Sequence, residues 1–266
     1  MSNSISVTVV TINYNDQAGL VRTAASLNAQ TAAFEWIIVD GGSSDDSVQM
    51  VRPYLRPADI LVSEPDRGIS DAFNKGIIRA SGDAIIFMNS GDEFASPDSL
   101  VDLVRAWDRG RHRWIVGAGD ILAVDGTLLF RRSWPGQPRD PFSLVRTNCR
   151  IIHQTVLADR ALFAELGPYR EDFKVAMDYE LWIRWLKAGH YPQVCQVPVC
   201  RFHRGGASGD PLRNHREFRK ARALHGMLNG VVGESLLQAL AWTKGRIRGR
   251  YGRWLYRLKE RLGVRI

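Results

Sequence analysis

Residues 63–94 read SEPDRGISDAFNKGIIRASGDAIIFMNSGDEF, and this stretch carries the strongest signals for fold and function. Helical spacing predicts a helix over Ser70–Ala80, and the apolar run Ala84–Met88 is typical of a strand buried in a parallel sheet. That strand ends in the polar, acidic loop Asn89–Glu93. In open α/β sheets ligands bind outside the carboxyl ends of the strands, so a carboxylate there is a candidate metal or phosphate site. The stretch therefore indicates an enzyme.

Upstream of this stretch, expected strands alternate with expected helices. The strands are Ser6–Tyr14, Phe34–Asp40 and Ala58–Ser63, and the helices are Gln17–Gln30 and a second that begins at Ser44 or Asp45 and runs to Tyr54. Alternation at this spacing predicts βαβ units and a parallel sheet.

Downstream, the pattern is more varied. Helices are expected at Pro97–Trp107, Leu157–Gly167 and Asp178–Ala188, and strands at Trp114–Gly119, Ile121–Arg131 and Tyr191–Arg201. Asp125-Gly126 marks a hairpin, and Ser133–Pro141 is rich in Pro and Gly, so we expect a loop there. From Pro211 the chain becomes helical and basic. We therefore expect one domain over residues 1–210 and a helical extension over 211–266.

Composition limits the class of protein. With 266 residues, 45% of them apolar, the chain can bury one substantial core. It has no uncharged apolar run of about 18 residues, so no spanning helix is expected. The first residues read as a strand and not as a signal peptide. The three cysteines form no CxxC pair, which favours reduced thiols in a cytoplasmic protein.

The positive charge is confined to one end of the chain. Trp242–Ile266 contains nine Lys or Arg residues and one acid, so this segment carries the whole net charge of +8 and the rest of the chain is neutral. Tyr251, Leu255, Leu258, Leu262 and Ile266 share one helical face, and arginines at 253, 257, 261 and 265 share another. A basic amphipathic helix suits an anionic membrane surface, although a solvated helix has the same pattern. A neutral body without a binding motif argues against nucleic acid.

Six motifs in order resemble one enzyme family. They are VTVVTINYN (7–15), WIIVDGGSSDDS (36–47), SEPDRGISDAFNKGIIRASGD (63–83), FMNSGDEF (87–94), HQ (153–154) and AMDYELWIR (176–184). The chain from Val7 to about Ser208 resembles the family 2 inverting glycosyltransferases, especially bacterial enzymes that build polysaccharides. The resemblance implies a GT-A fold, which is an α/β domain with a mostly parallel central sheet flanked by helices. Here the basic helical extension would follow it.

The resemblance also implies a nucleotide-sugar donor, with UDP as the expected nucleotide. Asp40 would bind the nucleoside, with Thr11 and Asn13 beside it; the alternative is that Asp40 only organises the Gly41-Gly42 turn. Arg67 is a candidate for the base or the phosphates. Asp71 and Lys75 either contact the donor or form an i,i+4 salt bridge.

A second group of residues concerns the leaving diphosphate. Asn89, Ser90, Gly91 and Asp92 stand where the family usually carries an acidic DxD-type triplet; this chain departs from it at Asn89 and Gly91 and keeps only Asp92. Mg²⁺ or Mn²⁺ needs one or two carboxylates when phosphate oxygens complete its shell, so a divalent cation is expected at Asp92, with His203 as a further ligand. The alternative for Asp92 is a turn or cap residue. Arg204 is a candidate for phosphate or sugar contact.

The acceptor side contains the expected base. Transfer needs a group that takes the proton of the attacking hydroxyl, and the resemblance assigns this role to Asp178; a helix N-cap is the alternative. His153 and Gln154 are expected to contact a sugar, because a polar pair is costly to bury without partners. Trp182 and Trp185 are expected in the core.

The expected function is metal-dependent, inverting transfer of a hexose to a hydroxyl of a lipid-linked or oligosaccharide acceptor. The enzyme would lie in the cytoplasm, peripherally on the inner face of the membrane. A nucleotidyltransferase is the alternative enzyme class, but residues 13–16 (NYND) lack its Gly-rich basic loop. A binding protein that lost the chemistry is the third possibility.

Overall fold

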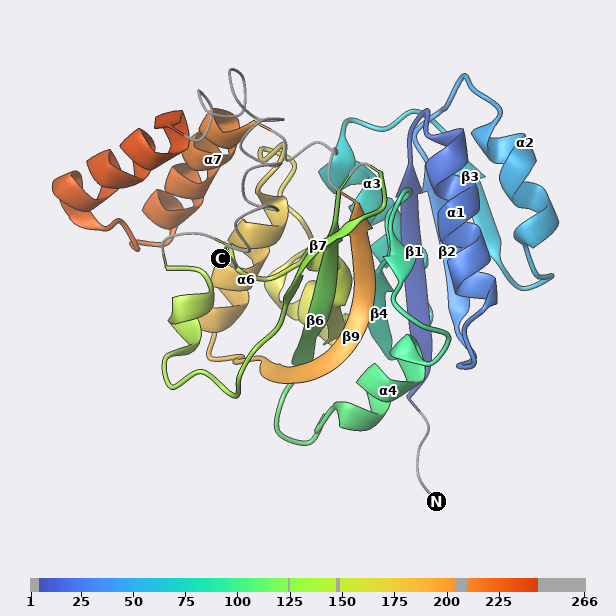
Figure 1. The fold of residues 1–266 in the computed structure, drawn as a ribbon, viewed down its shortest axis with the longest axis horizontal. Coiled ribbons are helices and arrows are strands. Elements are labelled where there is room, and N and C mark those ends of the chain that lie inside the picture. The colour runs from blue at the N-terminus through green and yellow to red at the C-terminus, as the bar shows by residue number, and fades with distance from the viewer. Residues whose placement is uncertain (1–4, 124, 147–148, 204–209, 244–266) are drawn as a thin grey trace.

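A computed structural model describes residues 5–123, 125–146, 149–203 and 210–243. Figure 1 shows a central sheet with helices on both faces and a pair of helices at one side. The sheet has nine strands, in the order β3-β2-β1-β4-β8-β6-β9-β5, with β7 paired to β6.

The first half of the sheet is parallel. Strands β1 (Val7–Asn13), β2 (Glu35–Asp40), β3 (Ile60–Ser63) and β4 (Ala84–Phe87) lie side by side in one direction. The register pairs Asn13 with Asp40 and Asp40 with Ser63, so three neighbouring strands end at the same level. Strands β2 and β3 lie on one side of β1 and β4 lies on the other, so the order of the parallel strands reverses at β1, which places a topological switch point at its carboxyl end.

The second half of the sheet is mixed. Its strands are β5 (Glu93–Phe94), β6 (Trp114–Leu122), β7 (Leu128–Arg132), β8 (Val156–Asp159) and β9 (Gln193–His203). Strand β8 runs antiparallel to β4 and β6, β7 forms the expected hairpin with β6, and β9 is parallel to β6. The α/β class is confirmed, with the fully parallel region confined to β1–β4.

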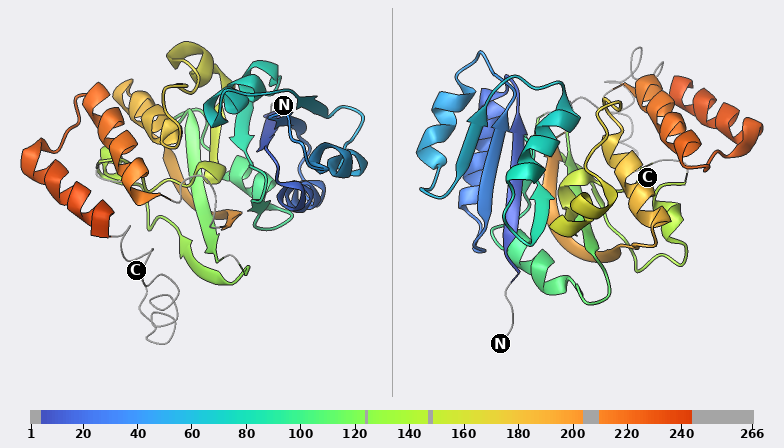
Figure 2. Two further views of the ribbon diagram at one scale, coloured as in Figure 1. Left: turned by 90° about the horizontal axis from the view of Figure 1, so that it is seen from above. Right: turned by 180° about the vertical axis from the view of Figure 1, so that it is seen from behind.

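Helices cover the two faces because the buried strands alternate between two apolar clusters. Helices α1 (Gln17–Asn28), α2 (Ser47–Val51) and α4 (Ser99–Ala106) contribute to one cluster, and α3 (Ile69–Arg79), α5 (Arg160–Leu166) and α6 (Met177–Lys187) to the other. Short 3-10 turns lie at Arg52–Tyr54, Pro141–Leu144 and His153–Thr155. Figure 2 shows both layers from above and from behind.

The indole rings of α6 belong to the core. Trp182 and Trp185 are fully buried, and Trp182 stacks on Trp114 with a centroid separation of 5.3 Å. The prediction of core tryptophans is therefore confirmed. Helix α7 (Pro211–Leu224) packs on α6 through Ala221 and Phe218.

A further helix spans residues 230–243 and is tied to α7 by a buried ion pair. The guanidinium of Arg222 is fully buried and donates to both carboxylate oxygens of Glu234, at 3.0 and 2.7 Å. The same guanidinium lies 3.4 Å from the hydroxyl of Tyr179 on α6. Three helices therefore meet at one charged contact.

One predicted element is wrong. The expected helix over Leu157–Gly167 begins only at Arg160, because Val156–Asp159 forms β8 between β4 and β6. A short apolar run does not distinguish a buried strand from a helix, and here the sheet contacts decide. Within the described ranges, no helix is both long and apolar enough to cross a membrane.

Candidate active site

A cavity of about 1730 Å³ opens at the carboxyl ends of the parallel strands. The loops after β1, β2, β3 and β4 line one side, and α6, α7 and the helix 230–243 line the other. Of the predicted site residues, the cavity brings together Asn13, Asn89, Ser90, Gly91, Asp92, His153, Gln154, Asp178 and His203.

The carboxylate of Asp40 is already occupied. It is fully buried and accepts hydrogen bonds from the Asn13 amide (2.7 Å), the Ser63 hydroxyl (2.7 Å) and both the amide and hydroxyl of Ser43 (2.9 and 2.5 Å). Burial acts to raise the pKa of this carboxyl, but the hydrogen bonds outweigh burial and hold the pKa below its usual value. Asp40 does not line the cavity, and its contacts hold the turn after β2, as the alternative interpretation describes; its contact with the nucleoside remains a prediction.

The acidic residue that does face the cavity here is Asp66. Its Oδ1 accepts the amide of Gly68 at 2.8 Å, and Gly68 has a φ of +126°. A Cβ at Gly41 would lie 2.3 Å from Oδ2 of Asp66 and 3.3 Å from the ring of Tyr14. Gly41 therefore leaves room for Asp66 and Tyr14 at the cavity wall. The sequence signal for Asp66 was its position shortly after a strand end and two residues before Gly68.

Arg67, Asp71 and Lys75 are not among the residues that line the cavity, and their donor contacts remain a prediction. The exposed guanidinium of Arg67 pairs with Asp71 (3.0 Å) and Glu171 (2.9 Å). Lys75 pairs with Glu64 (3.1 Å) and lies 3.6 Å from Asp71. The i,i+4 spacing therefore produces ion pairs at the start of α3, in which the buried Asp71 lies between the exposed Arg67 and the partly buried Lys75.

Thr11 also lies away from the cavity, since its hydroxyl accepts the indole N–H of Trp36 at 3.0 Å inside the core. Arg204 and the basic segment 244–266 lie outside the described residues.

The loop after β4 is held in a fixed shape. The hydroxyl of Thr23 lies 2.6 Å from the carbonyl of Asp92 and 3.1 Å from that of Asn89, and it accepts the amide of Gly91 at 3.1 Å. Gly91 has a φ of +92°, which a side chain would strain. The guanidinium of Arg22 donates to the carbonyl of Gly91 at 3.3 Å and lines the cavity, a contact with no sequence signal.

The carboxylate of Asp92 lies at the base of this loop. It accepts the Gln154 amide at 2.6 Å and the backbone amide of His203 at 3.2 Å. Burial raises the pKa of Asp92 to about 7. The ring of His203 lies 3.0 Å from the carboxylate of Glu93. Asp92 is therefore a poorly solvated acid whose charge a cation would stabilise.

The surrounding oxygen atoms fit a hard divalent cation. The side-chain oxygens of Asn89 and Gln154 are buried, and neither has a hydrogen-bond partner among the described residues. Carboxylate and amide oxygens are the ligands that Mg²⁺ and Mn²⁺ accept. No group of three or more His, Cys, Asp and Glu side chains in the described part of the chain could hold a metal ion. A cation here would therefore need further oxygen ligands, which waters or phosphate groups can supply.

His153 is held as a neutral ring. It stacks on Phe87 with a centroid separation of 4.9 Å, and its Nε2 forms a 2.7 Å hydrogen bond with the hydroxyl of Tyr169. Burial lowers the pKa of His153 to about 3. The ring is therefore uncharged near neutral pH, and it can form hydrogen bonds with a sugar only as a neutral imidazole.

Asp178 stands on the opposite wall, in the first turn of α6. The N-cap of this helix is Ala176, so the N-cap alternative for Asp178 is wrong. Its carboxylate accepts the amide of Tyr179 at 2.6 Å. Burial raises the pKa of Asp178 to about 6, and the negative charge of Glu217 acts in the same direction. A carboxylate with this pKa is ionised at neutral pH and can still take a proton.

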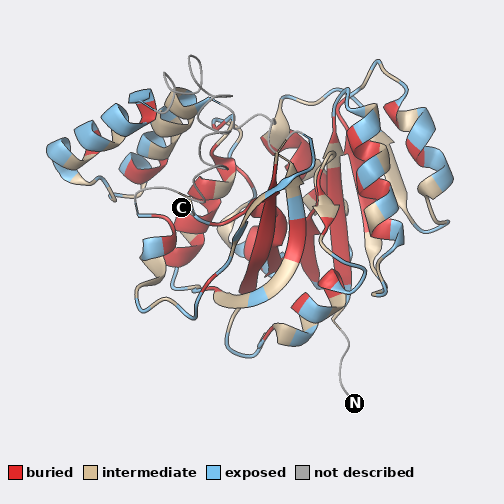
Figure 3. Ribbon diagram, in the orientation of Figure 1, coloured by how far each residue is buried: buried red, intermediate tan, exposed pale blue. Residues whose placement is uncertain are grey.

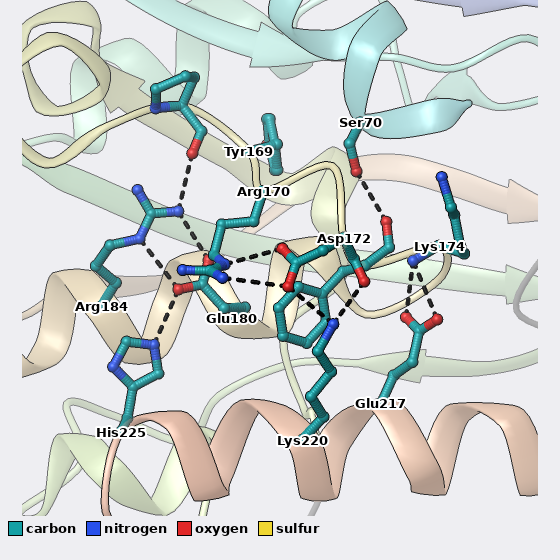
Figure 4. A network of polar contacts seen from close by, with 12 residues as sticks. Ser70, Tyr169, Arg170, Asp172, Lys174, Glu180, Arg184, Glu217, Lys220 and His225 are labelled. Carbon is teal, nitrogen blue, oxygen red and sulfur yellow. Dashed lines mark hydrogen bonds and ion pairs between the residues drawn. The ribbon is translucent and has the colours of Figure 1, made fainter. Parts of the chain in front are cut away.

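The loop before α6 is clamped by α7 (Figure 4). The carboxylate of Glu217 accepts the consecutive backbone amides of Lys174 (3.0 Å), Val175 (2.8 Å) and Ala176 (2.9 Å). Lys220 donates to Asp172 in the same loop at 2.8 Å. Sequence patterns did not indicate this clamp, nor the contribution of Asn214, His215 and Phe218 of α7 to the cavity wall.

Comparison of the sequence with known proteins identifies its family. The family model for glycosyl transferase family 2 matches residues 8–166, more than half of the chain. An uncharacterized glycosyltransferase of Mycobacterium tuberculosis is 33% identical over 234 residues, which cover 85% of this chain and 86% of that protein.

Two solved structures share the fold. A mannosyltransferase from Pyrobaculum calidifontis, in complex with GDP-Man and Mn²⁺, superposes with a TM-score of 0.64 at 17% identity, over 98% of this chain and 80% of that one. TarS 1–349 of S. aureus, in complex with UDP-GlcNAc, gives a TM-score of 0.62 at 16% identity, over 92% and 73%.

Proposed function

The chain belongs to glycosyl transferase family 2 and is a glycosyltransferase, and we propose that it moves a hexose from a UDP-sugar to an acceptor hydroxyl with inversion at the anomeric carbon. One observation carries the proposal. A single cavity has a loop with one buried acid, Asp92, on one wall, and a second acid with a pKa of about 6, Asp178, on the other. One carboxylate, Asp92, would therefore serve the donor, and the other, Asp178, would serve the acceptor.

We place the donor on the strand side of the cavity. Asn13, Asp66 and the backbone of Gly41-Gly42 would hold the nucleoside, and Asn89, Ser90 and Gly91 would lie along the diphosphate. Arg22, whose guanidinium already lies at the Gly91 carbonyl, would add positive charge there. Support for a nucleotide-sugar donor comes from the neighbours in complex with UDP-GlcNAc and GDP-Man.

Asp92 would hold a divalent cation, with the oxygens of Asn89 and Gln154 and the ring of His203 nearby. When bound, the cation would neutralise negative charge on the departing nucleoside diphosphate. The presence of Mn²⁺ in the mannosyltransferase complex supports this part of the proposal.

Asp178 would take the proton of the attacking hydroxyl. As the hydroxyl oxygen forms its bond to the anomeric carbon, the bond from that carbon to the diphosphate oxygen breaks on the opposite face. The proton passes to the carboxylate of Asp178, and the diphosphate leaves with the electron pair. His153 and Gln154, which line the cavity between the two acids, would orient the sugar.

For the acceptor we propose a lipid-linked or oligosaccharide hydroxyl used in bacterial polysaccharide synthesis. The nine basic residues after Trp242 would bring the enzyme to the inner face of the membrane, where a lipid-linked acceptor resides.

A panel of nucleotide sugars tests the proposal. We expect release of UDP from one donor in the presence of Mn²⁺ or Mg²⁺, stimulated by a membrane extract that contains acceptors. Release of GDP alone would change the donor assignment, and release from no donor would support a binding protein without catalysis.

A further inference from the structure

The helix 230–243 has a solvent-facing surface without charge. Its exposed side chains are Val231, Val232, Ser235, Leu236, Gln238, Ala239, Leu240, Trp242 and Thr243. Val231, Val232 and Leu236 are 86%, 75% and 61% exposed. The one charged residue of this helix, Glu234, is turned inward to Arg222. Figure 3 colours most of this helix as exposed.

A solvated helix normally shows charged residues on its outer side, and an exposed apolar stripe indicates an interaction surface. The neighbouring helix α7 follows the normal rule, since Arg213, Arg216 and Arg219 are exposed on it. The chain then continues from Lys244 into its basic segment. The uncharged stripe is therefore flanked by positive charge on both sides in the sequence.

We infer that the outer face of the helix 230–243 inserts into the surface of a bilayer that contains anionic lipid. Charge decides between a bilayer and a second copy of the chain. A second copy of the chain would carry the same positive charge, which the sequence places after Trp242, whereas anionic headgroups supply the opposite charge.

This face also adjoins the proposed active site. A role of the face in delivering the acceptor rests on the proposed function. Leu237, Leu240 and Ala241 of the same helix line the cavity, as do Asn89–Asp92 of the loop after β4. A lipid-linked sugar held at the membrane would meet an apolar rim before it reached Asp178.

The test uses the full chain and sedimentation with vesicles of phosphatidylcholine and phosphatidylglycerol, compared with phosphatidylcholine alone. V232Q/L236Q places two polar residues on the face, and neither residue lines the cavity. We expect this double variant to weaken vesicle binding by about tenfold or more, because the apolar area of two side chains is no longer transferred from water into the bilayer. The matched control is I78Q, since Ile78 on α3 is 79% exposed but lies elsewhere.

Equal binding by V232Q/L236Q and the unmodified chain would overturn the inference, as would no binding to either vesicle. A dimer in solution that V232Q/L236Q converts to a monomer would assign the face to a second copy instead. Vesicle binding needs no sugar transfer, so failure here and failure of the proposed function are distinguished by the nucleotide-release assay.

A separate observation concerns Glu217. Helix α6 has no side-chain cap of its own, and its N-cap residue is Ala176. The three amides at its start are instead bound by one carboxylate from α7, two residues before Asp178. We propose that Glu217 is the positioning residue of the base Asp178, in the transfer reaction proposed above.

The surroundings of Asp178 contain few other charges. Cys149 and Tyr169 lie near it as neutral groups; burial raises the pKa of both, and the charge of Asp178 acts in the same direction. Arg132, the neutral His153 and His215 line the same cavity. Glu217 is the negative group that acts on it. Removing that charge is therefore expected to lower the pKa of Asp178.

We expect E217A to lower kcat by about ten- to a hundredfold with little change in the donor KM, because the base is displaced while the donor wall is intact. E217Q keeps an acceptor oxygen but loses the charge, so the acidic limb of its pH–rate profile should move to lower pH. The control is K220M, which breaks the contact of the same helix with Asp172. An unchanged kcat in E217A would overturn the assignment. The assignment would also be overturned if E217A and K220M lowered kcat equally and the acidic limb of the E217Q pH–rate profile did not move.

Discussion

Replacing Asp178 by Asn is expected to abolish transfer and to stabilise the protein at the same time. The carboxyl has its pKa raised from 3.8 to about 6, chiefly by burial. In the unfolded chain it ionises near its ordinary value. Between these two values the folded state holds a proton that the unfolded state has lost, so stability falls as the pH rises through this window. Above about pH 6 the full penalty is present.

The size of the penalty follows from the shift. About two pKa units at about 1.36 kcal/mol each give roughly 3 kcal/mol. Asparagine carries no charge to desolvate and keeps an oxygen for the amide of Tyr179. We therefore expect D178N to gain about 1–3 kcal/mol at pH 7.5, which corresponds to a rise in Tm of roughly 2–6 °C. The gain should shrink to about 1 kcal/mol or less at pH 4.5, where the folded carboxyl is protonated in any case.

Thermal melts at pH 7.5 and 4.5 measure the gain, and nucleotide release with acceptor measures transfer, which should fall by about a hundred- to ten-thousandfold. D172N is the matched control in the same region. Asp172 is exposed and paired with Arg170 and Lys220, which lower its pKa, so its loss should destabilise at pH 7.5. If D178N lowered Tm at pH 7.5, or if it transferred sugar at the original rate, the reasoning would be refuted.

The remaining predictions concern other parts of the cavity. Transfer should fall about tenfold per pH unit below about pH 6, as Asp178 takes up its proton, and a flat pH–rate profile down to pH 5 would contradict this. Mn²⁺ affinity, measured by calorimetry with UDP present, should weaken below about pH 7 because a proton competes for Asp92, and D92N should lose the metal response. G41A should change the free energy of unfolding by no more than about 1 kcal/mol but raise the donor KM by roughly tenfold, since its Cβ displaces the Asp66 carboxylate; an unchanged KM would remove Asp66 from the donor site. R67A should leave the donor KM unchanged because its guanidinium lies outside the cavity, and a large increase would restore the donor role.

The parallel half of the sheet was predictable because its strands carry strong local signals. Apolar runs such as Ala84–Met88 end in polar loops, and the structure places the loop at 89–92 where that pattern predicted. Strand β8 was missed because its apolar residues are equally compatible with a helix and are assigned by their neighbours β4 and β6. Pairing between distant segments leaves little local trace in the sequence.

The site residues were also only partly predictable from the sequence. A motif shows which residues stand near a strand end but not which side chain turns inward. In the Asp66-Arg67-Gly68 turn the aspartate faces the cavity and the arginine faces solvent, because the ion pair of Arg67 with Asp71 holds it on α3. The glutamate of α7 that holds the start of α6 lies about 40 residues from the amides it binds, and no spacing rule reaches that far.

The ion pair between Arg222 and Glu234 has a consequence for where the chain can be cut. Arg222 is fully buried, and Glu234 is the acid that compensates its charge. A chain ended at residue 229 would remove Glu234 with the rest of its helix, so Arg222 would lose the acid that compensates its charge. A chain ended at residue 210 would also remove Glu217 from the loop before α6. Shortened versions of the enzyme should therefore end beyond residue 243, since the last two described helices complete the wall that holds Asp178.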